Sequence, residues 1–234
     1  MSARFFVKDL CIICLVLVVF TVSDCQASVR FLFIGNSYIF VNKGMDKQLE
    51  GLAPSIETVR LAFGGYNLEK HWIDGKALQA IRHGKWDYVI LQEQSQTPIF
   101  DQKKFYDFAR KFDQEIRRSG AKTILLMTWE RPDSINYGVT TANLAAAYNT
   151  LATELGSKVA PAGLAFAQAI RGKPNLLLYS KDGHPTKEGT YLAACVLYET
   201  VFKHSPVENA YSDKSISVET RAYLQRIAAE SIGY

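Results

Sequence analysis

The sequence predicts an α/β domain built on a parallel, doubly wound β-sheet. Three observations predict it: short, mainly apolar runs recur along the chain, segments with helical spacing separate them, and each run stops abruptly at glycine or polar residues. Short apolar runs suit strands that are covered on both faces, as in parallel sheets. Strands that alternate with helices over about 200 residues indicate helices on both faces of one sheet.

The expected strands follow in a regular order, with a weaker fifth candidate at the end: Val29–Ile34, Thr58–Phe63, Tyr88–Leu91, Thr123–Met127 and Lys158–Ala160. Pro161 restricts the fifth to an edge strand or a strand end, because proline cannot donate a ladder hydrogen bond.

Helical spacing is found between and after these runs, in Lys43–Leu52, Leu68–His83, Asp101–Ser119, Thr140–Gly156, Lys187–Lys203 and Ser217–Ser231. In the third of these segments, Phe105, Phe108, Phe112 and Ile116 recur every three or four residues, which is the pattern of one apolar helix face. The chain shows no internal repeat, linker or low-complexity tract, so residues 28–234 are expected to form a single domain.

The first 27 residues are of a different kind. Arg4 and Lys8 precede an apolar run of 11 residues, Leu10–Phe20, and small and polar residues lead to Ala27. This pattern matches a secretory signal peptide, and a membrane-spanning helix needs about 20 apolar residues. We expect cleavage after Ala27 and a secreted or periplasmic protein. An uncleaved anchor and a lipid-modified Cys25 are the alternatives.

The charged, cysteine and histidine residues argue against a nucleic-acid partner, a disulfide and a metal site. The 27 lysines and arginines exceed the 23 acidic residues by a net charge of +4, but they are scattered, so no nucleic-acid partner is expected. Only Cys195 lies beyond the leader, which leaves no intrachain disulfide, and its apolar helical surroundings predict a buried, inert thiol. His71, His83 and His204 lack ligand spacing, so we expect no metal or other cofactor.

Polar residues follow the predicted strands directly. They are Ser37 after the first, Gly64-Gly65 after the second, Gln92 to Ser95 after the third, Thr128-Trp129 after the fourth, and Asp182 to Pro185 beyond the fifth. Ligands of open α/β sheets bind outside the carboxyl ends of the strands. A hydroxyl, an imidazole and amide donors gathered at one edge are the groups that acyl transfer needs.

The order of these blocks resembles the SGNH (GDSL-type) hydrolases. Phe33 to Tyr38 resembles the first block of that superfamily, with Ser37 in the place of the nucleophile. Gly65 matches the second-block glycine, Gln94 stands where the oxyanion asparagine would be, and Asp182-Gly183-His184-Pro185 resembles the last block. The resemblance extends over about residues 29–202 and implies a three-layer α/β/α, flavodoxin-like fold with a five-stranded sheet.

This sequence departs from the pattern of that superfamily in three places. Asn36 replaces the usual aspartate before the serine, and Gln94 adds a methylene to the expected amide. Asp182 lies two residues before His184 rather than three, and Lys181 occupies the usual aspartate position. Either Asp182 or a backbone carbonyl is therefore expected to orient His184.

Each residue also has a structural interpretation. Asn36 and Ser37 suit a helix N-cap, and Gly64-Gly65 suits a turn with positive φ. Gln94 could be an ordinary strand-end amide, and His184 could cap the next helix. Trp129 is more typical of a core residue than of a substrate platform, and we assign Asn36 and Trp129 only a weak substrate-binding role.

Together these features predict a secreted serine esterase that needs no metal. His184 takes the proton of Ser37, and the amides of Ser37 and Gly65 with the Gln94 side chain hold the oxyanion. The resemblance suggests a small-molecule or carbohydrate ester as substrate, with an acetyl or another short acyl group; lipid and aryl esters are the alternative within the class. The alternative function is a catalytically weakened glycan- or ligand-binding module with the same fold. No stable membrane partner is expected unless the leader is retained.

Overall fold

The computed structural model describes residues 28–232, which form a five-stranded, all-parallel sheet in the order β2-β1-β3-β4-β5. Its strands are β1 (Val29–Gly35), β2 (Ile56–Ala62), β3 (Tyr88–Leu91), β4 (Lys122–Leu126) and β5 (Lys158–Ala160). This is the flavodoxin-like strand order. The predicted fold class is therefore confirmed, and the fifth strand lies at an edge of the sheet and ends directly before Pro161.

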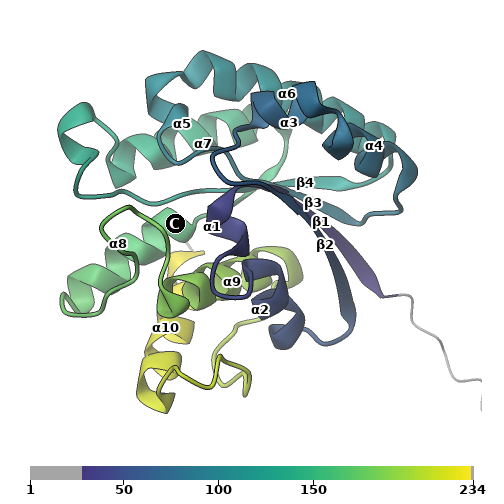
Figure 1. Ribbon diagram of the computed structural model, residues 1–234. Coiled ribbons are helices and arrows are strands. Elements are labelled where there is room, and N and C mark those ends of the chain that lie inside the picture. The colour runs from purple at the N-terminus through teal and green to yellow at the C-terminus, as the bar shows by residue number, and fades with distance from the viewer. Residues whose placement is uncertain (1–27, 233–234) are drawn as a thin grey trace, which may run out of the picture.

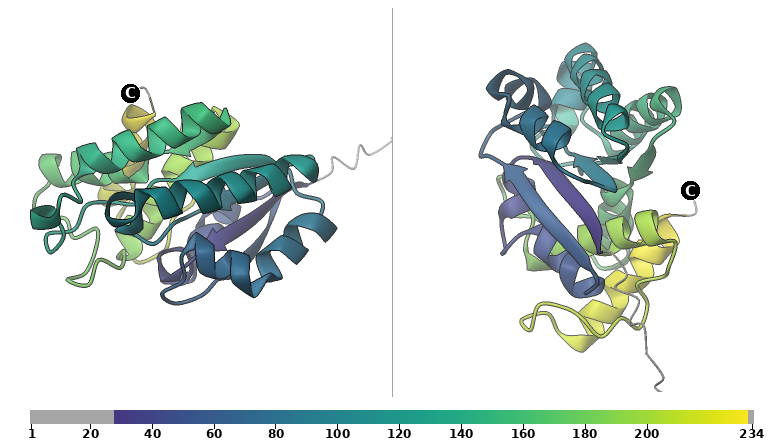
Figure 2. Two further views of the ribbon diagram at one scale, coloured as in Figure 1. Left: turned by 90° about the horizontal axis from the view of Figure 1, so that it is seen from above. Right: turned by 90° about the vertical axis from the view of Figure 1, so that its right-hand side faces the viewer.

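Helices cover both faces of the sheet (Figure 1). On one face lie α3 (Leu68–Asp74), α4 (Lys76–His83), α5 (Thr97–Phe100), α6 (Gln102–Arg118) and α7 (Thr141–Leu155). On the other lie α1 (Ser37–Phe40), α2 (Met45–Leu52), α8 (Ala162–Gly172), α9 (Lys187–Phe202) and α10 (Val218–Ser231). Figure 2 shows the same arrangement from above and from the right-hand side of Figure 1.

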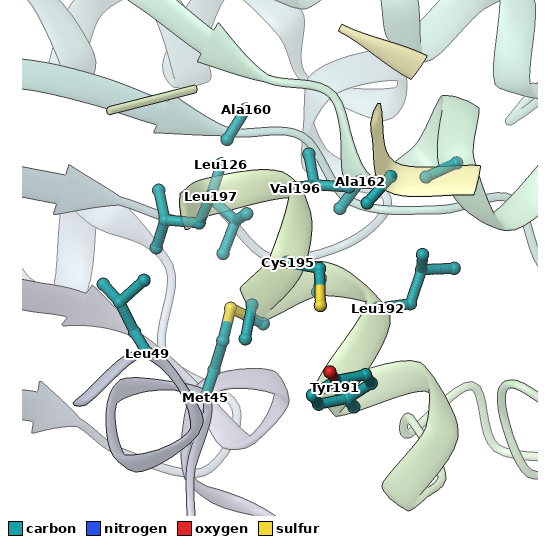
Figure 3. Packing of buried hydrophobic residues seen from close by; sticks show 14 of the residues in the cluster. Met45, Leu49, Leu126, Ala160, Ala162, Tyr191, Leu192, Cys195, Val196 and Leu197 are labelled. Carbon is teal, nitrogen blue, oxygen red and sulfur yellow. The ribbon is translucent and has the colours of Figure 1, made fainter. Parts of the chain in front are cut away.

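Alternation along the strands creates a core on each face of the sheet. In β1, Phe31 and Phe33 pack toward the α2/α9 face, whereas Leu32 and Ile34 pack toward the α3/α6 face. All four side chains are fully buried, which is why this strand reads as a continuous apolar run. Cys195 on α9 lies in the first core near Met45 and Leu192 (Figure 3), and burial raises the pKa of its thiol to about 12.

The helices differ from the sequence prediction in two ways: one predicted helix is broken, and some helices were not predicted. The expected helix Leu68–His83 is two helices, because Gly75 adopts a left-handed conformation that ends α3 at Asp74. Helix α8 and the four-residue helices α1 and α5 were not predicted. Four of the five buried residues of α8 are alanine or glycine (Ala162, Gly163, Ala165 and Ala169), and these small side chains mark a core face less plainly than large apolar ones.

The topology places a crevice at the carboxyl end of the sheet. The chain leaves β1 toward β2 on one side and returns to β3 on the other, so β1 and β3 are neighbours whose outgoing loops run in opposite directions. Such a switch point is where open α/β sheets bind ligands. Ser37 follows β1 and the segment from Gln92 to Ser95 follows β3, so both segments begin at this point.

The predicted signal peptide, residues 1–27, lies outside the described residues. Among residues 28–232, no helix is long and apolar enough to cross a membrane.

Candidate active site

Ser37 is the first residue of α1, directly after β1. Asn36 caps this helix, since its Oδ1 accepts a hydrogen bond from the backbone N–H of Tyr38 at 3.1 Å. The N–H of Ser37 belongs to the first turn, where no carbonyl within the helix can accept it, and no acceptor for it occurs among the described residues. The Ser37 hydroxyl and one free backbone donor therefore lie on the same residue.

His184 contacts this hydroxyl from the other end of the chain. Its Nε2 lies 2.8 Å from Ser37 Oγ, although 147 residues separate the two in the sequence. Its Nδ1 lies 2.9 Å from Asp182 Oδ2. The three side chains form a continuous chain of hydrogen bonds, from carboxylate to imidazole to hydroxyl. Asp182, and not a backbone carbonyl, contacts Nδ1.

Asp182 is held in place by its own turn. Its Oδ1 accepts hydrogen bonds from Ser180 Oγ at 2.5 Å and from the backbone N–H of His184 at 3.2 Å. These bonds, with the contact to the His184 ring, lower the pKa of Asp182 to about 2, so the carboxylate is ionised at neutral pH. The side chain is 67% exposed, and water therefore screens its charge.

Trp129 anchors the turn that carries His184. Its indole Nε1 donates to the carbonyl of Gly183 at 3.1 Å, and Arg131 Nη1 donates to the carbonyl of Asp182 at 3.1 Å. The Trp129 ring also stacks on Tyr38, the residue after the nucleophile, with ring centres 4.8 Å apart. One side chain thus touches both the serine helix and the histidine turn.

Burial corrects the weak substrate-binding role given to two residues. Trp129 is 1% exposed, stacked between Tyr38 and Phe166, so it presents no face to a substrate. Asn36 is 4% exposed, and its Nδ2 donates to the carbonyl of Tyr66 at 3.1 Å. Both side chains fix the loops of the site relative to one another instead.

The expected oxyanion donors come from three loops. Gly65 lies in the turn after β2 with φ +68°, and its N–H, like that of Ser37, has no acceptor among the described residues. Gln94 uses its Oε1 to accept from the backbone N–H groups of Gln96 and Thr97, at 2.9 and 3.1 Å. Its Nε2 contacts Ser95 Oγ at 3.4 Å. The carbonyl half of the amide therefore shapes the loop, while the nitrogen keeps a proton to donate.

Gln92 is a structural member of the site that sequence reasoning missed. It is fully buried at the end of β3, and its Oε1 accepts the backbone N–H of Asn36 at 2.9 Å. This bond ties the loop after β1 to the loop after β3. A signal was present, since a glutamine that directly continues a buried strand must find hydrogen-bond partners inside the protein. Arg131 gave no such signal, because its contact with the histidine turn is made across the fold.

His71, the other histidine near the site, is a buried residue with a structural hydrogen bond. His71 on α3 is 1% exposed and its Nε2 lies 2.7 Å from the carbonyl of Gly35, and burial lowers its pKa. Within residues 28–232, no group of three or more histidine, cysteine, aspartate or glutamate side chains is arranged to hold a metal ion.

Solved structures with this architecture are SGNH/GDSL-like hydrolases and lipolytic proteins. A candidate SGNH hydrolase from Slackia heliotrinireducens is 28% identical, with a TM-score of 0.65 over 74% of this chain and 98% of that one. A DUF4886 family protein from Bacteroides uniformis is 21% identical, with a TM-score of 0.70 over 88% and 95% of the two chains. An acetyl xylan esterase, AlAXEase, is 15% identical, with a TM-score of 0.57 over 74% and 100%.

No protein-family model and no curated protein matches the sequence. The structural neighbours nevertheless confirm the resemblance to SGNH hydrolases at the level of the fold, across about 74% of the chain.

Proposed function

We propose that this protein is an exported serine esterase that hydrolyses short acyl esters of carbohydrates through an acyl-enzyme. The observation that carries the proposal is the hydrogen-bonded chain from Asp182 through His184 to Ser37, with distances of 2.9 and 2.8 Å. A hydroxyl is a weak nucleophile until a base accepts its proton, and an adjacent imidazole held in one orientation supplies that base.

The expected reaction has two steps. Ser37 Oγ attacks the ester carbonyl while its proton passes to His184 Nε2, and the alcohol then leaves with that proton. Water attacks the acyl-serine in the same way and releases the acid. Asp182 contacts Nδ1 throughout, which fixes the tautomer whose Nε2 can accept a proton and stabilises the imidazolium once it forms.

Oxyanion stabilisation is assigned to the N–H groups of Ser37 and Gly65 and to Gln94 Nε2. The two backbone donors lack acceptors among the described residues, which leaves them available to a tetrahedral intermediate. Donors fixed before the reaction stabilise the developing charge without reorganising at the moment of attack.

The substrate class is inferred from two observations of different kinds. One structural neighbour is an acetyl xylan esterase, which at 15% identity shares the fold alone. The connections that follow β3 and β4 also carry two exposed aromatic side chains, Phe100 at the end of α5 and Tyr137, whose rings meet edge to face with centres 6.2 Å apart. Exposed apolar side chains in connections at the carboxyl end of the sheet, where ligands bind, offer a surface to a substrate, and flat rings suit the faces of sugars.

Export is the part of the proposal that rests on the leader. A secreted or periplasmic enzyme would meet acylated polysaccharides outside the cell. N-terminal sequencing of the exported protein tests this directly: a first residue of Ser28 supports cleavage after Ala27, and an intact leader contradicts it.

Hydrolysis of p-nitrophenyl acetate by the wild type and by Ser37→Ala tests the mechanism. We expect the variant to lose activity by a factor of about 10⁴ or more. Ser205→Ala is the matched control, since Ser205 is exposed and follows His204 at the end of α9 away from the site. Equal rates for wild type and Ser37→Ala would refute the role of Ser37.

A fluorophosphonate probe separates catalysis from binding. Mass-spectrometric labelling at Ser37, absent in Ser37→Ala, supports an activated hydroxyl. Gln94 and the short spacing from Asp182 to His184 favour the alternative, a glycan- or ligand-binding module, although Asp182 contacts the ring despite that spacing. If the probe and all esters are inert while a glycan binds, the alternative holds. A panel of acetylated sugars and of short- and long-chain esters then identifies the acyl group and the alcohol.

A further inference from the structure

Glu93 is a buried carboxylate beside the site to which the proposed mechanism gives no role. It follows Gln92 at the end of β3 and is 1% exposed. A carboxylate buried to this degree needs hydrogen-bond donors around it. Its partners are therefore informative.

The two oxygens of Glu93 bind backbone donors of two different loops. Oε1 accepts the N–H of Gln94 at 2.6 Å, and Oε2 accepts the N–H of Leu68 at 3.4 Å. Leu68 begins α3 directly after the loop that contains Gly65. One side chain thus joins the two loops that carry the expected oxyanion donors Gln94 and Gly65.

The ionisation of Glu93 is set by groups on three helices. Burial is the main cause that raises its pKa to about 7. The charge of Glu69 on α3 acts in the same direction, whereas the N–H groups of Gln94 and Leu68 and the charge of Lys104 on α6 act in the opposite direction. From α7 the hydroxyl of Tyr148 faces it, and burial together with the charge of Glu93 raises the pKa of that phenol. The carboxyl can therefore change charge near neutral pH. A protonated oxygen is itself a donor, and it cannot accept a backbone N–H in the same direction.

We propose that the ionised Glu93 is a positioning residue that holds the Gln94 loop and the Gly65 loop in one arrangement, and that protonation of Glu93 releases this arrangement. The inference rests on the proposed function for its catalytic consequence, because the two loops matter to the reaction as oxyanion donors. Its structural half, the coupling of both loops to one carboxylate, is measurable without any substrate.

Glu93→Gln separates positioning from simple packing. The amide has the same shape, but its single oxygen can accept only one of the two N–H groups, and its NH₂ opposes the other. We expect kcat to fall about tenfold to a hundredfold with little change in KM, because misplaced oxyanion donors weaken the transition state and not substrate binding. The acid limb of the pH profile should also lose the ionisation of Glu93.

Glu69→Gln is the matched control. It removes the charge of Glu69 and leaves the hydrogen bonds from Glu93 to Gln94 and Leu68 in place, so maximal activity should be unchanged. Since Glu69 raises the pKa of Glu93, its loss should move the ionisation of Glu93 to lower pH. The corresponding step in the activity profile should move with it.

NMR provides the decisive measurement. In protein labelled with ¹³C-glutamate, the Glu93 carboxyl signal is identified by its absence in Glu93→Gln, and the amide signals of Gln94 and Leu68 are followed over the same pH range. The inference is supported if the carboxyl and both amides titrate with the same midpoint pH, and if Glu69→Gln shifts the three midpoints together. The inference is overturned if the amide signals of Gln94 and Leu68 do not change with the carboxyl titration. It is also overturned if Glu93→Gln keeps the wild-type kcat and pH profile.

These outcomes are distinct from failure of the esterase proposal. If no ester is hydrolysed and Ser37 is not labelled, the proposed function fails, and the NMR titration still decides whether Glu93 holds the loops. If Ser37-dependent hydrolysis is normal in Glu93→Gln, the function stands and the inference about Glu93 fails alone. Should Glu93→Gln not fold, the coincidence of midpoints in wild type and Glu69→Gln remains the test.

Discussion

Replacement of Trp129 by phenylalanine tests how the fold holds the histidine turn against the serine helix. Trp129 Nε1 donates to the carbonyl of Gly183 at 3.1 Å, and the ring stacks on Tyr38 and Phe166 with centres 4.8 and 4.1 Å away. Phenylalanine keeps an aromatic ring in this stack but removes the N–H. The variant therefore isolates the bond to the residue that precedes His184.

The structure sets the expected size of both effects. Gly183 is buried, so a carbonyl left without its donor costs about 1–3 kcal/mol of folding free energy. A displacement of about 1 Å can cost 10²-fold in rate. Arg131 still holds the carbonyl of Asp182 at 3.1 Å, which limits the movement of the turn. We therefore expect kcat/KM to fall about tenfold.

Urea unfolding measures the stability change, and p-nitrophenyl acetate hydrolysis measures the rate. Trp86→Phe is the control, because Trp86 Nε1 also donates to a backbone carbonyl, that of Ala80 at 2.7 Å, at the opposite end of the sheet. It should lose stability while keeping wild-type kcat/KM. If Trp129→Phe, like this control, loses stability but keeps wild-type kcat/KM, Trp129 is merely a core residue and the positioning argument is wrong.

Three further predictions concern the charged and amide groups of the site. Asp182→Asn should lower kcat/KM about tenfold to a hundredfold, less than the about 10⁴-fold known for a buried triad aspartate, because Asp182 is 67% exposed; a larger loss in ester assays would contradict this. Gln94→Glu keeps the oxygen that accepts from Gln96 and Thr97 but replaces the free donor by a negative charge, so kcat should fall by at least about 10²-fold with stability nearly unchanged. The raised pKa of Glu93 means that the folded protein binds this proton more tightly than the unfolded chain, whose value is near 4.5. The free energy of unfolding of the wild type, compared with Glu93→Gln, should therefore decline by up to about 3 kcal/mol as the pH rises from about 4.5 to 8, and parallel curves in urea unfolding would refute this.

Much of the fold could be predicted from the sequence because buried parallel strands leave a local signal. All five strands lie within two residues of their predicted bounds, since each contains a short apolar run that is closely followed by glycine, proline or polar loop residues. The helices were predicted less completely than the strands. The break at Gly75 depends on a left-handed turn, and α8 contains small residues whose burial is decided by α9 and α10 packed against it.

The sequence alone determined which chemical groups reach one edge of the sheet. Strand order along the chain and the polar residues after each strand were enough to select Ser37, Gly64-Gly65, the segment from Gln92 to Ser95, and His184 as candidates, because parallel strands deliver their carboxyl ends to the same side. The resemblance to SGNH hydrolases singled out Gly65 and Gln94 within these segments. No long-range contact had to be known for this step. The common location of these segments follows from the direction of the chain in parallel strands.

Only the tertiary structure decided how those groups are oriented. Asp182 contacts His184 Nδ1 because Ser180 and the backbone of His184 fix its other oxygen. Trp129 is buried because Phe166 and Tyr38 close over it, although its position after a strand equally suits a surface residue. Burial and hydrogen bonding of loop side chains depend on partners that lie far away in the sequence, and loops have no periodicity that records them.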